Sequence, residues 1–269
     1  MPSLFNTTRL QGKTVVVTGA SAGIGAATAV LFAKAGANLV LLARRQNLLD
    51  EVKAAALAGA KEFGQDISVV VKTLDVNDRA AVDGLVGELK AAGVKRFDVL
   101  VNNAGGAIGV EKAGDIALAD IDFMINTNLV SLIQLTQAFL AEFKAQDAGH
   151  IINIGSLAGR EAYVGGSIYC AVKHAVRAFT TSVRKEVVAT GIRVTEVAPG
   201  AVETNFSVVR FRGDEGAAKN VYKGIEPLVA EDIAEEIVWV AGRPAHVQIA
   251  ELFLLPTAQA SATIFGRKE

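Results

Sequence analysis

Short apolar runs alternate with longer amphipathic segments along almost the whole chain. The short runs predict strands, and the longer segments predict helices. The predicted strands are residues 15–18, 38–42, 69–74, 99–101, 151–154, 193–197 and 252–255. The predicted helices are residues 22–34, 46–59, 79–92, 116–145, 169–190 and 231–241. This alternation predicts an α/β fold, in which right-handed crossovers wind a parallel sheet and place helices on both of its faces.

The segment from about residue 202 to residue 224 departs from this pattern. It carries many charged residues and shows only weak periodicity. A long segment without a core pattern is often a functional lid, here a lid over a substrate. A plain surface excursion has the same sequence character, so both interpretations stand. The rest of the chain contains no internal repeat and no linker, which predicts a single domain over residues 1–269.

Composition agrees with one large domain. Hydrophobic residues make up 51% of the 269 residues, which suits parallel strands buried on both faces. The net charge of -1 gives no reason to expect nucleic acid or an anionic membrane as a partner. No apolar run reaches the roughly 18 residues of a membrane span. Cys170 is the only cysteine, so we expect no internal disulfide and a reducing, cytoplasmic location. No metal site is predicted.

A glycine-rich turn joins the first predicted strand to the first predicted helix. Its spacing, Gly-x-x-x-Gly-x-Gly, is one residue longer than the usual dinucleotide fingerprint. Glycines there let the backbone approach a pyrophosphate, and the helix N-terminus supplies free N–H groups. Glycines also form plain turns, but the position between strand and helix favours cofactor binding. The residues predicted to contact the cofactor are Gly19, Ser21, Gly23, Ile24 and Gly25.

Two arginines follow the second predicted strand. Enzymes of this fold that bind NAD usually place an acid there for the ribose 2′-hydroxyl, whereas arginine suits a 2′-phosphate. Ala43 occupies the acid's position, and Arg44 and Arg45 come next. The alternative is a pair of solvated arginines at the start of a helix, where a basic residue fits the helix dipole poorly. We therefore predict NADP(H) as the cofactor, with Arg44 and Arg45 at its phosphate.

Two further strand ends carry candidate cofactor contacts. Asp75, next to Val76, follows the third predicted strand, where its carboxylate is suited to the adenine amino group. A turn-forming or helix-capping role is nearly as consistent with the sequence. Asn102-Asn103-Ala104-Gly105 follows the fourth predicted strand, where small residues allow a ligand to approach closely. We predict that Asn102, Ala104 and Gly105 contact the cofactor; a simple turn leaves the two asparagines unexplained.

Tyr169 and Lys173 are candidates for acid–base chemistry. They are four residues apart on a predicted helix and therefore share a face. A nearby ammonium favours the phenolate and lowers the pKa of tyrosine, so the pair can exchange a proton with an alcohol or ketone oxygen. Ser156 follows a strand end and can hydrogen-bond the same oxygen. Asn128 lies inside a predicted helix, where its amide either distorts the helix and holds a water or packs against a neighbouring strand.

These motifs, taken together and in order, resemble the short-chain dehydrogenase/reductase family. The motifs are Gly19-x-x-x-Gly23-x-Gly25, Asn102-Asn103-Ala104-Gly105, Asn128, Ser156, Tyr169-x-x-x-Lys173 and Pro199-Gly200. The resemblance implies a single-domain Rossmann-type, doubly wound sheet of seven strands. It also implies that Tyr169 transfers the proton, that Lys173 lowers its pKa and holds the nicotinamide ribose, that Ser156 positions the substrate oxygen, and that Asn128 keeps a relay water. The segment implied to face the nicotinamide contains Pro199, Gly200, Val202 and Thr204.

A narrower resemblance lies in the C-terminal third. Residues 206–213, 220–222 and 255–257 are similar to the NADP-dependent 3-hydroxy acid (serine) dehydrogenases of bacteria and fungi, and residues 156–163 and 168–171 are closest to the fungal members. This resemblance implies a homotetramer that oxidises L-serine and short 3-hydroxy acids and also reduces ketones and aldehydes. Ala22 departs from relatives that carry a basic residue there, which leaves Arg44 and Arg45 to select the phosphate.

A hydroxy acid also needs a partner for its carboxylate, and a bidentate arginine is the usual one. We predict Arg160 or Arg210 for that role; surface or subunit contacts are an equal alternative. A broad carbonyl or secondary-alcohol reductase is the second enzyme hypothesis. An NADP(H)-sensing regulator and a structural subunit of a larger oxidoreductase are the hypotheses from other classes, and the intact set of catalytic residues argues against both.

Overall fold

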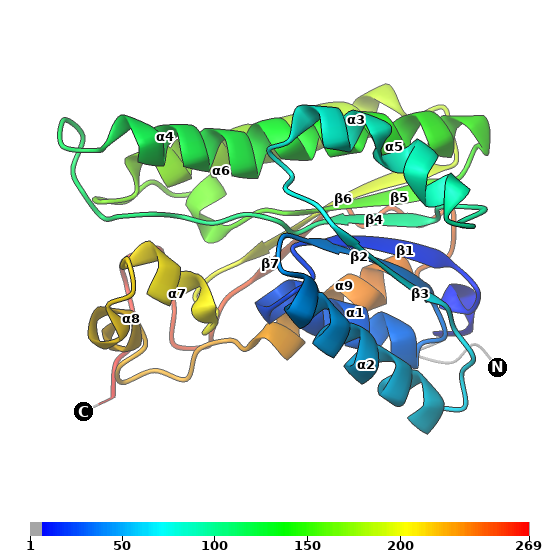
Figure 1. Ribbon diagram of the computed structural model, residues 1–269. Coiled ribbons are helices and arrows are strands. Elements are labelled where there is room, and N and C mark those ends of the chain that lie inside the picture. Colours follow the sequence, from blue (N-terminus) through cyan, green and yellow to red (C-terminus); the bar gives the residue numbers. More distant parts are fainter. Residues whose placement is uncertain (1–6, 269) are drawn as a thin grey trace.

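The computed structural model describes residues 7–268, which contain one sheet of seven parallel strands (Figure 1). The strands are β1 (Thr14–Thr18), β2 (Asn38–Ala43), β3 (Val69–Thr73), β4 (Val99–Asn102), β5 (Gly149–Ile154), β6 (Ile192–Pro199) and β7 (Glu251–Leu254). Their spatial order is β3-β2-β1-β4-β5-β6-β7, so the direction of winding reverses between β1 and β4. Ligands of doubly wound sheets bind at the carboxyl ends of the strands beside this reversal.

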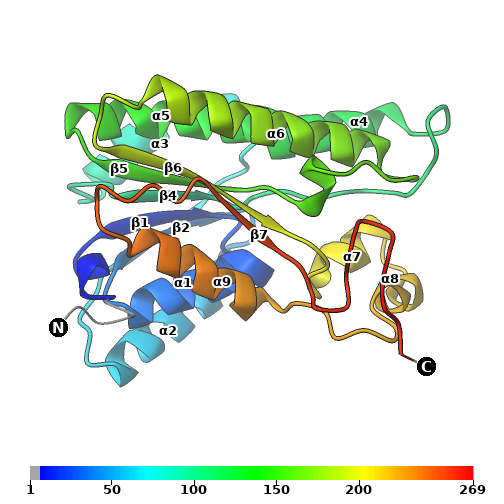
Figure 2. The same cartoon turned by 180° about the vertical axis from the view of Figure 1, so that it is seen from behind.

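Helices cover both faces of the sheet. One layer contains α1 (Gly23–Lys34), α2 (Gln46–Glu62) and α9 (Ala230–Ala241), and the other contains α3 (Arg79–Ala91), α5 (Ser131–Ala145) and α6 (Ser167–Glu186) (Figures 1 and 2). In β1, Val15 and Val17 pack with Phe32 of α1, whereas Val16 packs with Phe139 of α5. Successive strand residues are thus buried on opposite faces, which explains the continuous apolar runs in the sequence.

The helix predicted over residues 116–145 is interrupted. It consists of α4 (Leu118–Ile125), a π-helical turn η2 (Asn126–Val130), and α5. The Asn128 side chain donates a hydrogen bond to the Met124 carbonyl at 2.8 Å, and the backbone N–H of Ser131 reaches Asn126, five residues back. The amide side chain thus competes for a carbonyl that an α-helix uses internally, and the helix widens around it.

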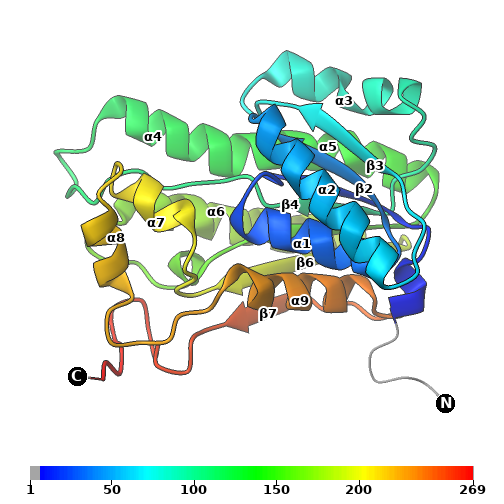
Figure 3. The same cartoon turned by 60° about the horizontal axis from the view of Figure 1, so that its bottom comes forward.

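Two short helices fill the segment predicted as a lid. They are α7 (Asn205–Arg210) and α8 (Glu215–Val221), joined by a turn in which Arg212 and Gly213 have positive φ angles of 55° and 94°. Thr204 and Asp214 cap the two helices through their side chains. In Figures 2 and 3 the C-terminal segment runs back beside α8. There the Lys268 N–H donates to the Gly224 carbonyl at 2.8 Å.

The remaining boundaries differ from the predicted ones by a few residues. Helix α6 begins at Ser167, before Tyr169, and ends at Glu186 rather than at residue 190. A hydrogen bond from the Thr190 hydroxyl to the Val187 carbonyl turns the chain toward β6. Among residues 7–268, no helix combines the length and the apolar character needed to cross a bilayer.

Candidate active site

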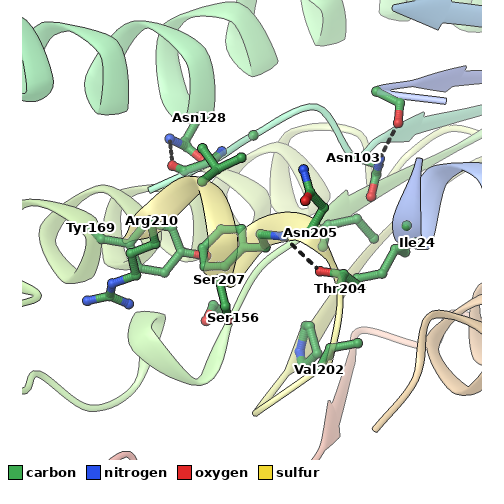
Figure 4. Close-up of a pocket in the computed structure, with 18 of the residues that line it drawn as sticks. Ile24, Asn103, Asn128, Ser156, Tyr169, Val202, Thr204, Asn205, Ser207 and Arg210 are labelled. Carbon is green, nitrogen blue, oxygen red and sulfur yellow. Dashed lines mark hydrogen bonds between the residues drawn. The ribbon is translucent and has the colours of Figure 1, made fainter. Parts of the chain in front are cut away.

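A pocket of about 570 Å³ lies at the carboxyl ends of β1, β4, β5 and β6 and is bounded by α7. Figure 4 shows its two ends: Ile24 and Asn103 lie on one side, and Tyr169 and Arg210 lie on the other. Most of the predicted site residues line this pocket, although they come from the whole length of the chain. The fold therefore brings the glycine turn, the Tyr169–Lys173 helix and the lid to one cavity.

The glycine turn is held in place by the segment that follows β4. The Asn103 side chain donates to the carbonyls of Thr18 and Gly19 at 2.9 and 3.3 Å. The Thr18 hydroxyl accepts the N–H groups of Asn103 and Ala104 at 3.0 and 2.9 Å. Neither Thr18 nor Asn103 was among the predicted site residues. For Thr18, the available signal was a buried polar residue directly after the Val15–Val17 run of β1.

Close packing explains the first and last glycines of the turn. A Cβ atom on Gly25 would collide with the carbonyl oxygen of Gly19 and with the Asn103 side chain. A Cβ atom on Gly19 would lie 2.9 Å from Ala104 Cα, and Gly19 also has a φ angle of 64°. Helix α1 then begins without a side-chain cap or an acidic residue in its first turn. Its free N–H groups and partial positive charge suit a pyrophosphate.

Asn102 corrects one prediction. Its side chain is 3% exposed and donates to Thr136 Oγ1 at 3.0 Å and to Asn153 Oδ1 at 2.9 Å. These contacts join β4 to β5 and α5 inside the core, and the pocket is lined instead by Asn103, Ala104 and Gly105. Adjacent strand-end residues point in opposite directions, so only one of two neighbouring asparagines can face the cavity.

The two arginines after β2 do lie at the pocket. Arg44 and Arg45 are exposed, and Arg45 Nη2 donates to Ser21 Oγ at 3.1 Å. Ala43 is buried and offers no carboxylate. Helix α2 also begins without a side-chain cap and has no acid in its first turn. Two guanidinium groups, a hydroxyl and an uncapped helix end therefore suit a phosphate better than a ribose hydroxyl.

Asp75 and Val76 line the same end of the pocket. One Asp75 carboxylate oxygen accepts the backbone N–H of Asn77 at 2.9 Å, which makes a local Asx turn. The turn-forming role is thus present in the structure, and it leaves Asp75 at the cavity wall.

Tyr169 and Lys173 lie one turn apart on α6. Both side chains are mostly buried, and Lys173 Nζ is 5.7 Å from the centroid of the Tyr169 ring. Lys173 Nζ donates to the Ile154 carbonyl at 2.8 Å. Ser156, which follows β5, lies close enough to the Tyr169 side chain to lower its pKa, and the Ser156 hydroxyl accepts the Ala158 N–H at 3.1 Å. A phenol, an ammonium and a hydroxyl therefore converge at one point of the pocket.

The protonation states of this pair follow from burial. Burial raises the pKa of Tyr169 above its ordinary value, and the Tyr163 phenol adds to the rise, while the Ser156 hydrogen bond and the Arg210 charge partly offset it. Burial also lowers the pKa of Lys173 to about 8, against the opposing charge of Glu196. The predicted lowering of the Tyr169 pKa is therefore reversed in this structure, because desolvation of the phenolate outweighs the favourable charges.

Asn128 is 1% exposed and is held from several sides. Its amide donates to the carbonyls of Met124 and Gly106, each at 2.8 Å, and accepts the Gly106 N–H at 3.0 Å. Both of its N–H donors are thus engaged by the backbone. The predicted distortion of the helix is present, and the same contacts tie η2 to the segment after β4 rather than to a strand.

Arg160 does not reach the pocket, so it is wrong as a predicted carboxylate ligand. Its side chain is 14% exposed, and it pairs with Glu196 at 3.4 Å and with Glu251 at 2.8 Å. Two carboxylates of the protein already occupy its guanidinium fork. No local pattern predicted this pairing, because the acids come from β6 and β7.

Arg210, the other candidate, does line the pocket. It donates to the Tyr163 hydroxyl at 2.8 Å and to the Gly165 carbonyl at 3.1 Å, and its guanidinium carbon is 5.9 Å from the Tyr169 ring centroid. Its Nε is buried and has no hydrogen-bond partner among the residues that the structure describes. A buried donor without a partner is costly and marks a place where a ligand oxygen fits.

The nicotinamide-facing residues and the lid are linked. Pro199, Gly200, Val202 and Thr204 all line the pocket. The Tyr222 hydroxyl donates to the Val202 carbonyl at 2.8 Å and lies 2.6 Å from the Ser207 hydroxyl. Tyr222 thus joins α7 and the end of α8 to the segment after β6. Its role, like that of Tyr163, depends on contacts distant in sequence, and no local motif indicated it.

Comparison with known proteins places the chain among its relatives. The family model described as short chain dehydrogenase matches residues 13–214, which is most of the chain. The chain belongs to the short-chain dehydrogenase family. The family matched is the one that the motifs resemble, and the seven-stranded parallel sheet agrees with its solved structures.

Individual short-chain dehydrogenases are similar over nearly their full length. The NADP-dependent 3-hydroxy acid dehydrogenase of Schizosaccharomyces pombe is 45% identical over 97% of this chain and 99% of its own. Sulfoacetaldehyde reductase 2 of Chromohalobacter salexigens is 42% identical over 91% of this chain and 95% of its own. The closed form of a serine dehydrogenase complexed with NADP+ superimposes with a TM-score of 0.86 at 38% identity, covering 95% of this chain and all of that one.

Proposed function

We propose that the chain is an NADP(H)-dependent oxidoreductase that oxidises L-serine and short 3-hydroxy acids, or reduces the corresponding keto compounds. The observation that carries this proposal is the convergence of Tyr169, Ser156 and Lys173 at a pocket whose far end holds the glycine turn and two arginines. Relatives and a structural neighbour that are named as NADP-dependent 3-hydroxy acid or serine dehydrogenases support it.

The pocket's cofactor end suits NADP(H), which supplies or accepts the hydride when bound. The glycine turn and the N-terminus of α1 would hold the pyrophosphate, and Arg44, Arg45 and Ser21 the 2′-phosphate. Asp75 and Val76 would lie at the adenine. The residues proposed at the nicotinamide and its ribose are Ala104, Gly105, Lys173, Pro199, Gly200, Val202 and Thr204.

Proton transfer is assigned to Tyr169. Its hydroxyl gives a proton to the carbonyl oxygen during reduction and takes it from the alcohol during oxidation. Ser156 hydrogen-bonds the substrate oxygen and the Tyr169 side chain, so it aligns the two reacting oxygens. Lys173 provides positive charge beside the phenol and favours the phenolate that forms when the proton leaves. Asn128 shapes η2 and fixes the wall of the pocket next to Gly106.

Arg210 is proposed to bind the substrate carboxylate. It is a pocket-lining cation with a buried and unpartnered Nε, within the part of the chain that the structure describes, and it lies beside Tyr169. A charge-assisted hydrogen bond to a carboxylate oxygen would satisfy that donor. Two relatives are named for their substrates, a 3-hydroxy acid in one case and sulfoacetaldehyde in the other. Both compounds carry an acidic group close to the reacting carbon. The anionic group is thus the feature that we expect the pocket to select.

A broad carbonyl or secondary-alcohol reductase is the second candidate. The pocket wall near Tyr169 also contains Phe123, Leu157 and Phe206, which suit an apolar substituent on a ketone. For the protein as a whole we propose a cytoplasmic homotetramer. Exposed apolar side chains at Leu118, Val164 and Phe253, on α4, the loop before α6 and the edge strand β7, supply surface for subunit contacts.

A steady-state substrate panel tests these assignments. Turnover is followed at the nicotinamide absorbance band with NADP(H) and NAD(H), and with L-serine, 3-hydroxybutyrate, sulfoacetaldehyde and simple ketones. We expect the highest kcat/KM with NADP(H) and an anionic substrate. Equal or better kcat/KM with uncharged ketones would favour the reductase hypothesis. Tight NADPH binding without turnover of any compound would favour a regulator.

A further inference from the structure

A group of charged side chains lies behind the Tyr169 end of the pocket, between β6, β7 and α6. Glu196 of β6 is 1% exposed and pairs with Arg160 at 3.4 Å through Oε1. Arg160 also pairs with Glu251 of β7, and Arg177 of α6 lies 3.7 Å from the same Glu251 carboxylate. Glu196 Oε2 is buried and has no hydrogen-bond partner among residues 7–268.

Glu196 lies against the peptide unit that Lys173 binds. A Cβ atom on Gly155 would collide with Glu196 Oε1, so the carboxylate rests on the backbone of Gly155. Lys173 Nζ donates to the carbonyl of Ile154, which belongs to the same peptide bond. The carboxylate and the ammonium therefore contact the same peptide unit, directly before Ser156.

The sheet geometry explains how both groups come from the same side. Val194 packs in the core cluster beneath α5 and α6, and Glu196, two residues later in β6, has the same orientation. Lys173 projects from α6 toward the sheet, and Arg177 follows it by one helical turn. Two carboxylates, Glu196 and Glu251, thus lie among three cations.

Charge in this place is expensive unless it is compensated. A buried carboxylate with one free oxygen is unfavourable on its own, and so is a buried ammonium with a single backbone acceptor. Arg160 reaches only one oxygen of Glu196, at the long distance of 3.4 Å. The field of Glu196 raises the pKa of Lys173, whereas burial lowers it. Burial also raises the pKa of Glu196, and the charges of Arg160 and Arg177 offset part of that rise. Glu196 therefore stabilises the Lys173 ammonium, while the two arginines help to keep the carboxylate ionised.

We propose that Glu196 is the internal counter-charge of Lys173, a positioning residue that keeps the ammonium protonated beside Tyr169. The inference rests on the proposed function for its effect on catalysis, but the charge coupling itself does not need turnover. Glu196 makes no contact with the reacting oxygens and acts through Lys173. The other charged groups around it are Arg160, Arg177 and Glu251.

The direct test measures the protonation of Lys173 in the full-length protein. Trace acetylation with acetic anhydride is quantified at Lys173 by mass spectrometry across pH 6 to 10, for the wild type and Glu196→Gln. We expect the labelling midpoint of Glu196→Gln to fall by about half a pH unit or more, because the opposing charge is gone. The midpoint of the alkaline limb in the pH profile of kcat/KM should move to lower pH by a similar amount, and NADPH affinity should be unchanged.

Two variants separate this effect from a structural one. Glu196→Asp keeps the charge and should restore the midpoint. Glu251→Gln removes a carboxylate from the same group but not from the Ile154–Gly155 peptide, so its midpoint should match the wild type. An unchanged midpoint in a folded Glu196→Gln protein, or an equal shift in Glu251→Gln, would overturn the proposal.

The coupling can also be measured without a variant of Glu196. Since coupling between two sites is reciprocal, Lys173→Met should move the ionisation of Glu196 to higher pH, as followed by carbon NMR of labelled glutamate carboxyl groups. No movement would contradict the proposal even if Glu196→Gln fails to fold. If the wild type shows no turnover, the proposed function fails, while the labelling and NMR results still decide the coupling.

Discussion

The two ends of the pocket are built in different ways. The cofactor end is built where strands end. It consists of the glycine turn after β1, which the Asn103 side chain holds in place, and the start of α2. The substrate end is assembled from side chains of α6, of the segment after β5 and of the lid, and the lid residue Arg210 is held there by Tyr163 and Gly165. The first is a feature of the scaffold, whereas the second depends on contacts between elements far apart in the chain. Mutations should therefore affect the two ends separately.

Gly25→Ala acts on the cofactor end and gives the largest expected effect on cofactor binding. The added methyl group would meet the Gly19 carbonyl and the Asn103 side chain, and neither can move without opening the turn. We expect NADPH affinity to fall by roughly 100-fold or more, as for the loss of several backbone contacts. Fluorescence titration measures this. Gly87→Ala is the matched control, because a Cβ atom there meets nothing within 4 Å.

Arg210→Gln should affect the substrate end alone. Loss of one charge-assisted pair typically costs about 2–3 kcal/mol, so kcat/KM for L-serine should fall roughly 30- to 150-fold. Turnover of an uncharged ketone should change only a few-fold, and NADPH affinity should stay the same. Lys219→Gln serves as control, since Lys219 is an exposed cation of α8 that pairs with Glu215. A similar loss of kcat/KM for L-serine and for the uncharged ketone would show that Arg210 does not bind the substrate carboxylate.

Arg44→Asp tests the cofactor end alone, at the proposed 2′-phosphate site. A carboxylate at this position repels a 2′-phosphate and can accept a hydrogen bond from a ribose hydroxyl. We expect the ratio of kcat/KM for NADP+ to that for NAD+ to fall by about tenfold or more. The KM for L-serine at saturating cofactor should be unchanged. An unchanged preference for NADP+ would show that the 2′-phosphate binds away from Arg44.

Tyr222→Phe has the smallest expected effect and concerns the lid. It removes the hydrogen bonds to Val202 and Ser207, each of which contributes about 1 kcal/mol to net stability. We expect a modest fall in thermal stability and a few-fold rise in the KM for substrate, with kcat nearly kept. Thermal melts and steady-state kinetics check both. A loss of NADPH affinity instead would show that the lid also shapes the cofactor end.

The features that the sequence predicted are those set by a local pattern, and the features that it missed are those set by contacts between distant elements. The strands, the glycine turn and the arginines after β2 were predictable, because each depends on a local pattern of a few residues. The inward side chain of Asn102 and the pairing of Arg160 with Glu196 and Glu251 were not. At Asn128 a distortion of the helix was one of two expectations, but its π-helical form and its contacts with Gly106 were not predictable. These features depend on which residues of distant elements meet, and a single sequence does not encode that locally.

The burial of Tyr169 is another feature of the folded chain. The four-residue spacing to Lys173 predicted a shared face and a lowered pKa for the phenol. The structure keeps the shared face but buries the phenol, so its pKa rises, and the neighbouring Tyr163 phenol adds to the rise. The extent of desolvation depends on tertiary packing, which the spacing alone cannot supply.

The most direct test of the central claim compares wild-type protein with Tyr169→Phe. NADP+ reduction by L-serine is followed at the nicotinamide band, and NADPH affinity is measured by titration on the same samples. We expect turnover by the wild type and a loss of roughly a thousandfold or more in Tyr169→Phe, through loss of the acid–base group. NADPH affinity should stay within a few-fold. Substantial turnover by Tyr169→Phe would contradict the account, and so would a collapse of NADPH binding.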